Sequence, residues 1–335
     1  MHTADRFERG GAQTALWAGI SFVVGYCLLL WALGGRLASI AHLPDQGAGW
    51  YFWVLPEQTV AGRVSAWGLY LTHQLFLFWL IWRAQHSGLR YTSGLHRINV
   101  VALVGNGAFA LLHVLQTHLW YDGLAQDVNV FTSFGSVAVV LIWVLLMENN
   151  RRGLFFGAKA PIGKRIWAFA RKYHGYYFAW AILYTFWFHP AEATSGHLVG
   201  FFYTLLLMLQ GSLFFTRVHI NKWWTLTQEV LVVAHGTIVA LMQGQAGWTM
   251  FLFGFTAIFI VTQMHGLGWS RRTRLGVALA WLAAAAAIYS QVGWGRWQEI
   301  YRIPLIDYVG VVVLGLLFAV LVRLFRFRPV GSAGP

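Results

Sequence analysis

Residues 13–33 read QTALWAGISFVVGYCLLLWAL, without a charged side chain. A helix needs about 20 mainly apolar residues to cross the hydrocarbon core of a bilayer, so this run is long enough to span one. Similar runs recur along the chain and predict ten spans in all. Their approximate bounds are 13–33, 64–84, 98–121, 128–147, 172–189, 194–216, 223–244, 246–266, 275–292 and 305–326.

The composition agrees with this prediction. Hydrophobic residues make up 58% of the 335 residues and charged residues only 10%, whereas soluble domains carry about 25% charged residues. The single cysteine, Cys27, excludes a disulfide scaffold. The runs lack the alternation of a membrane β-barrel. We therefore expect an all-α, polytopic transmembrane helical bundle that forms one integral membrane domain over residues 1–335.

The positions of the basic residues predict an orientation, because cytoplasmic loops carry an excess of Lys and Arg. With a cytoplasmic N-terminus, 20 of the 24 basic residues fall on the inner side: Arg6, Arg9, Arg83, Arg90, Arg97, Arg151, Arg152, Lys159, Lys164, Arg165, Arg171, Lys172, Arg217, Lys222, Arg271, Arg272, Arg274, Arg323, Arg326 and Arg328. Only Arg36, Arg63, Arg296 and Arg302 fall outside. The acids expected outside are Asp45, Glu57, Asp122, Asp127, Glu192, Glu299 and Asp307.

Because most basic residues fall on one side, the net charge of +13 indicates how the chain is oriented in the membrane. It predicts both termini in the cytoplasm, a multi-pass protein of the cell inner (cytoplasmic) membrane, and attraction to anionic membrane lipids. A nucleic-acid partner is not expected. The basic cytoplasmic loop 148–171 also holds the apolar residues Ile166, Trp167 and Phe169 among basic neighbours, which is typical of a short helix lying on the inner leaflet.

A group of histidines and acids is predicted near the outer surface. His189, Glu192 and His197 lie in one short link between two spans, and His113 lies in the outer half of another span. Histidine nitrogens and carboxylate oxygens are ligands of zinc, iron and copper. These four residues are the candidate site for a transition metal. Alternatively, Glu192 and His197 form a catalytic general-base dyad without a metal, or the histidines are ordinary interfacial residues.

Two histidines are expected near the middle of the membrane, His73 and His235, each within a different span. Two neutral imidazoles from different helices are the usual axial ligands of a haem, which makes haem b a candidate cofactor. A hydrogen bond between helices is the alternative role for each. Glu229 is the one acid predicted well inside a span. It is a candidate for proton transfer, with His235 and Gln263 nearby along the path.

These residues lead to three functional hypotheses. The first is a membrane oxidoreductase with a His-ligated haem or metal that serves electron transport or oxidises a lipophilic substrate. The chain has no nucleotide-binding motif, so electrons would come from a quinol or an electron-donor protein. The second is a proton-coupled transporter or channel. The third is a cofactor-free transferase or hydrolase with an outward-facing His/Glu site. A homo-oligomer is compatible with all three.

Overall fold

The computed structural model describes residues 10–44, 46, 50–242, 244 and 247–327. These residues form ten α-helices and no β-sheet, which confirms the predicted all-α fold. The helices are α1 (Gly11–Leu33), α2 (Val60–Gln85), α3 (Arg97–Trp120), α4 (Val130–Arg152), α5 (Lys164–Phe188), α6 (Ser195–Ser212), α7 (Lys222–Met242), α8 (Trp248–Val261), α9 (Arg271–Val292) and α10 (Glu299–Leu324). Four residues of the charge pattern, Arg6, Arg9, Asp45 and Arg328, lie outside the described residues.

Eight segments of the described chain are long and apolar enough to cross a membrane. They are Gly11–Arg36, Val60–Gln85, Arg97–Trp120, Val130–Arg152, Lys222–Met242, Trp248–Gly266, Arg271–Val292 and Trp294–Leu324. The chain is therefore a polytopic, multi-pass membrane protein whose helices contact lipid. The helices α5 and α6 do not reach this threshold, so the count of ten spans and the orientation of the termini stay predictions.

The helices α5 and α10 begin well before their predicted spans. α5 begins at Lys164, so the segment around Trp167 is its first part rather than a separate interfacial helix. Lys and Arg are good helix formers, and a basic flank extends a helix beyond its apolar run. α10 begins at Glu299 and contains Pro304 inside the helix, where a proline leaves one helical backbone hydrogen bond unmade. Asp307, expected outside the membrane, lies within this helix, as it does within the predicted span 305–326.

Contacts divide the chain into two compact units. Unit 1 comprises Met1–Val137 and Gly175–Gln228, and unit 2 comprises Ala138–His174 and Glu229–Pro335. The boundaries fall inside α4, α5 and α7, so each of these helices contributes residues to both units.

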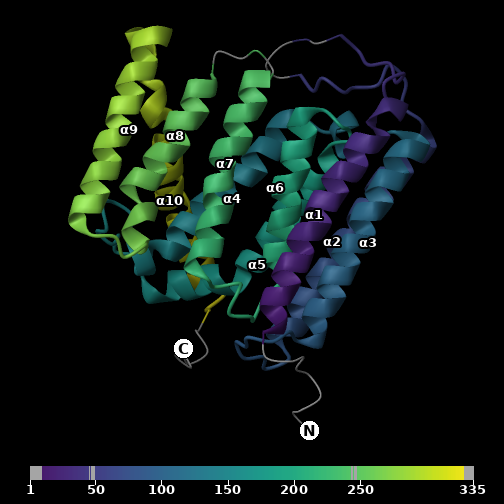
Figure 1. Cartoon of the computed structure of the whole chain (residues 1–335). Coiled ribbons are helices and arrows are strands. Elements are labelled where there is room, and N and C mark those ends of the chain that lie inside the picture. The colour runs from purple at the N-terminus through teal and green to yellow at the C-terminus, as the bar shows by residue number, and fades with distance from the viewer. Residues whose placement is uncertain (1–9, 45, 47–49, 243, 245–246, 328–335) are drawn as a thin grey trace. The chain divides into compact units, whose positions relative to one another are not determined.

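In unit 1, α1 packs against α6 and α2 packs against α3 (Figure 1). The hydroxyl of Thr59 accepts a hydrogen bond from the backbone N–H of Gly62 at the start of α2, and Thr194 does the same for His197 at the start of α6. These side chains satisfy N–H groups that have no partner within the helix. The second half of α5 is the most deeply buried part of the unit, with side chains that are fully enclosed: Leu183, Phe186, Trp187 and Phe188.

The burial of α5 and α6 explains their lower hydropathy. A helix that is enclosed by other helices meets side chains rather than lipid, so it tolerates polar groups that find partners there. His197, Thr204 and Ser212 are all buried on α6. Hydropathy alone therefore recognises the lipid-facing helices of this chain better than the enclosed ones.

In unit 2, α8 packs against α10 (Figure 1). From Pro304 onward, the residues that α10 buries follow a helical spacing of three or four, which defines one inward stripe: Pro304, Asp307, Val311, Leu314, Phe318 and Val322. Large apolar side chains such as Leu305, Ile306, Val309 and Leu316 are exposed on its other faces. This helix presents an apolar surface to lipid and a stripe with one carboxyl group to the core.

Candidate functional site

An open cleft lies at one end of unit 1, where α1 ends and α6 begins. It has a volume of about 420 Å³, within the range of about 300–1,000 Å³ that is usual for ligand sites. Its wall combines apolar and aromatic side chains with one acid, one histidine and one hydroxyl: Trp31, Gly34, Gly35, Leu37, Ala38, Ile40, His42, Trp53, Glu192, Ala193 and Thr194. The predicted outer residue Glu192 thus borders a cleft of ligand size.

The carboxylate of Glu192 is buried and held in place by hydrogen bonds. The Tyr121 hydroxyl donates to Oε1 of Glu192 at 2.5 Å, and the backbone N–H of Ala193 donates weakly to Oε2 at 3.4 Å. The Tyr121 hydroxyl also lies 2.7 Å from Nε2 of His42. His42, Tyr121 and Glu192 form a connected row, which we call the cleft triad.

Tyr121 adopts an unusual backbone conformation. It follows the last residue of α3 with φ 41° and ψ 75° in the left-handed region, which a bulky side chain rarely occupies. The residue is 5% exposed. Burial, and secondarily the hydrogen bond to Glu192, raise the pKa of Tyr121. Strained residues of this kind cluster at functional sites, because the surrounding structure must hold them in place.

Three of the four predicted metal ligands do lie close together. The rings of His189 and His197 are 5.2 Å apart, and the His113 ring faces the backbone of His189. Nδ1 of His197 lies 2.8 Å from the Thr194 hydroxyl, whereas its Nε2 has no hydrogen-bond partner among the described residues. Glu192, the fourth predicted ligand, accepts a hydrogen bond from the Tyr121 hydroxyl.

No group of three or more His, Cys, Asp or Glu side chains within the described residues is positioned to hold a metal ion. The metal site at His113, His189, Glu192 and His197 therefore stays a prediction. Tyr51 adds a further contact to this region, because its hydroxyl lies 3.1 Å from Nδ1 of His189. Burial raises the pKa of Tyr51, and the nearby Glu192 raises it further.

Both ring nitrogens of His73 have hydrogen-bond partners. Nε2 lies 2.7 Å from Oδ1 of Asn106, and the indole N–H of Trp187 donates to Nδ1 at 3.3 Å. The amide of Asn106 in turn donates to the Ser212 hydroxyl at 2.8 Å. The ring also stacks on Phe109 at 4.1 Å between centroids. We call the four residues Trp187, His73, Asn106 and Ser212 the neutral chain.

This arrangement bears on the haem hypothesis. An iron ligand needs a nitrogen lone pair, and Trp187 already uses the one on Nδ1 of His73 when Nε2 donates to Asn106. His73 belongs to unit 1 and His235 to unit 2, so their pairing as ligands of one haem stays a prediction.

Glu229 lies in unit 2 and is paired with an arginine. Nη1 of Arg152 lies 2.7 Å from Oε2 of Glu229, and the two side chains are 1% and 8% exposed. The amide of Gln263 donates to the same carboxylate at 2.9 Å. Gln263, which the sequence placed on a path with Glu229, is thus in direct contact with it. We call Arg152 and Glu229 the charged pair.

Sequence reasoning missed several residues of these sites. Tyr121 and His42 were not singled out and Arg152 was counted only among the basic residues of the inner side, because the partners of all three come from distant parts of the chain. Asn106 and Asp307 had a signal, because a single polar group within an apolar run is unusual. Comparison with known proteins gives no match, since no family model, curated protein or solved structure is similar to this chain.

Proposed function

We propose that the cleft of unit 1 is the active site of a cofactor-free membrane transferase or hydrolase, with Glu192 as its general base. The observation that carries this proposal is a buried carboxylate, oriented by Tyr121, in the wall of a cleft of about 420 Å³. A general base must be held within hydrogen-bond reach of the proton that it removes. Glu192 meets the two conditions of a fixed orientation and access to the cleft.

The two oxygens of Glu192 have different partners, which suggests their roles. Oε1 accepts the hydrogen bond from Tyr121, whereas Oε2 has only the long contact with the Ala193 N–H. Oε2 is therefore the oxygen that takes a proton from an attacking hydroxyl group or water. Tyr121 fixes the carboxylate, and His42 orients Tyr121 from the other side. The proton returns from Glu192 to the leaving group in the second half of the reaction.

The cleft wall suggests an amphipathic substrate. Trp31, Trp53 and Leu37 offer apolar contact area, while Thr194 and His42 offer polar contacts beside Glu192. Such a wall fits a molecule with an apolar part and a hydroxyl or ester group, such as a membrane lipid. The contact of unit 1 with the bilayer gives a lipid direct access to this region.

The proposal is tested by incubating the purified protein in liposomes made from a total lipid extract and following the lipids by mass spectrometry. We expect the wild-type protein to convert one lipid class. Glu192→Gln should do so at least about 100-fold more slowly, since general-base catalysis contributes about 10²–10⁴ in rate. Tyr121→Phe keeps the ring and loses only the hydroxyl, so it should reduce the rate by a smaller factor.

The matched control is Glu57→Gln, which changes an exposed acid outside the cleft. It should leave the rate unchanged. Equal rates for wild type and Glu192→Gln, or no lipid conversion by the wild type, would contradict the proposal.

A second candidate is a metal-dependent oxidoreductase that uses His113, His189 and His197. Support comes from the proximity of the three imidazoles and from the unpartnered Nε2 of His197. Elemental analysis of the purified protein tests this candidate, and an absorption spectrum tests the haem hypothesis. One equivalent of metal, lost in His197→Ala, would favour the redox function with a quinol or donor protein as electron source.

A further inference from the structure

Asp307 occupies a core position of a membrane helix without a charged partner. It belongs to the inward stripe of α10 and is 3% exposed, and its Oδ2 has no hydrogen-bond partner among the described residues. Isolated ionised carboxylates in apolar surroundings are very unfavourable, so such groups stay protonated. Asp307 is therefore a neutral acid that carries a proton in the membrane interior.

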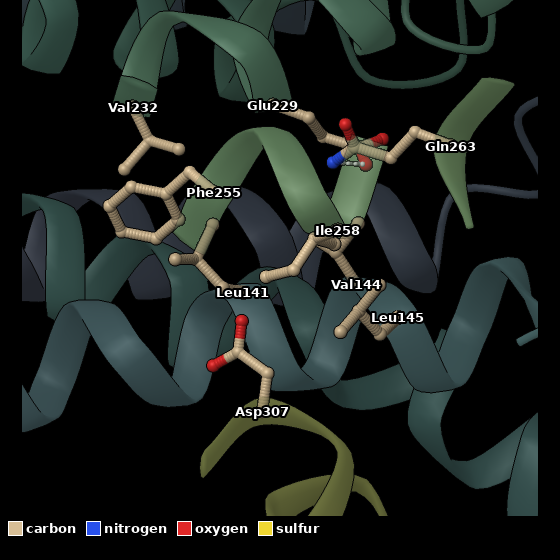
Figure 2. Close-up of a pocket in the computed structure, with 9 residues that line it drawn as sticks. All are labelled: Leu141, Val144, Leu145, Glu229, Val232, Phe255, Ile258, Gln263 and Asp307. Carbon is tan, nitrogen blue, oxygen red and sulfur yellow. Dashed lines mark hydrogen bonds between the residues drawn. The ribbon is translucent and has the colours of Figure 1, made fainter. Parts of the chain in front are cut away.

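The carboxyl group of Asp307 borders a small cavity in unit 2. The cavity has a volume of about 20 Å³, and one water molecule needs about 10–15 Å³ of the same measure. Figure 2 shows Asp307 on one side of the cavity and Glu229 with Gln263 on another. The rest of its wall is apolar: Leu141, Val144, Leu145, Val232, Phe255 and Ile258. The space fits one water, and the polar side chains that line it are Asp307, Glu229 and Gln263.

Glu229 differs from Asp307 in having a cationic partner. Its carboxylate is matched by the guanidinium of Arg152 at 2.7 Å, which stabilises the ionised form. The other ionisable group next to Asp307 is Tyr308, whose hydroxyl is 2.8 Å from the Thr262 hydroxyl, and α8 carries no ionisable residue. The cavity thus has a proton donor at one side and a proton acceptor at another. Two carboxyl groups in such different environments are the usual basis of an acid–base pair.

We propose that Asp307 and Glu229 form a proton relay through unit 2, with a water molecule in the cavity between them. In the forward step, Asp307 gives its proton to the water while the water gives one to Glu229. One negative charge moves from Glu229 to Asp307 and no electron is transferred. His235, which the sequence suggested for such a path, does not border this cavity. The relay is independent of the proposed active site in unit 1.

The relay is tested with the full-length protein in liposomes that contain a pH-sensitive dye and carry a potassium gradient with valinomycin. The wild-type protein should admit protons at a rate above that of protein-free liposomes. Asp307→Asn has the shape of the protonated acid but cannot release a proton, so it should lower the flux about 100-fold. The control Glu57→Gln should keep the wild-type flux.

Infrared spectroscopy provides a second measurement that does not depend on flux. The wild-type protein should show the carbonyl band of a protonated carboxyl group at neutral pH, and Asp307→Asn should lack it. The proposal is overturned by a wild-type protein without proton flux, by undiminished flux in Asp307→Asn, or by the absence of that carboxyl band from the wild type.

Discussion

Two buried polar networks, one in each unit, are built differently. In unit 1, the neutral chain of Trp187, His73, Asn106 and Ser212 links α5, α2, α3 and α6 by hydrogen bonds between uncharged groups. In unit 2, the charged pair of Arg152 and Glu229 lies beside the lone carboxyl group of Asp307. The first arrangement satisfies its members and suits a structural role. The second keeps a carboxyl group whose Oδ2 has no hydrogen-bond partner among the described residues, which is typical of a functional role.

The charged pair should show the largest effect of a single substitution. Arg152→Met leaves Glu229 as a buried charge without its partner, which should reduce the free energy of unfolding by about 3–5 kcal/mol. Equilibrium unfolding in detergent micelles measures this change. The double variant Arg152→Met with Glu229→Leu removes both charges and should be close to the wild type in stability.

A matched control for this prediction is the ion pair of Arg63 and Asp127 in unit 1, in which Arg63 is 55% exposed. Arg63→Met should reduce stability by only about 0–1 kcal/mol, because water screens an exposed pair. Similar losses for Arg152→Met and Arg63→Met would show that burial of the charged pair is unimportant.

The neutral chain should show an intermediate effect. Asn106→Ala removes the acceptor for His73 and the donor to Ser212, so two buried groups lose a partner. We expect a loss of about 1–3 kcal/mol in the free energy of unfolding. Ser212→Ala removes only one end of the chain and should cost less. If Asn106→Ala destabilised the protein more than Arg152→Met, the distinction between the two units would be wrong.

Asp122 should give the smallest effect and one that depends on pH. Burial raises the pKa of this carboxyl from 3.8 to about 6 in the folded protein, so the folded state binds the proton more tightly than the unfolded state. Its contribution to stability is present below about pH 4 and is lost as the pH rises through about 6. Asp122→Asn should flatten the pH dependence of the melting temperature across this window. An unchanged profile in this variant would contradict the assignment.

The sequence predicted the lipid-facing helices well because lipid contact imposes a long apolar run. The predicted span 98–121 corresponds to α3 (Arg97–Trp120), and 275–292 lies within α9 (Arg271–Val292). Enclosed or basic segments gave less accurate bounds, as at the start of α5, since hydropathy reports the lipid environment and not the helix itself.

The candidate sites were harder to predict than the fold. Glu192 was recognised as a candidate near the outer surface, but its hydrogen-bond partner Tyr121 lies 71 positions away along the chain. His42, which contacts Tyr121, lies a further 79 positions from Tyr121. Asp307 was counted with the outer acids because it lies close to the start of the predicted span 305–326. Long-range contacts and exact helix ends determine these sites, and neither follows from periodicity.

The rate of lipid conversion by the wild type and by Glu192→Gln, measured side by side in liposomes of the same extract, tests the central claim about the cleft most directly. We predict conversion by the wild type and by Glu57→Gln, and a rate at least about 100-fold lower in Glu192→Gln. Conversion at equal rates in all three proteins would show that Glu192 is not the general base.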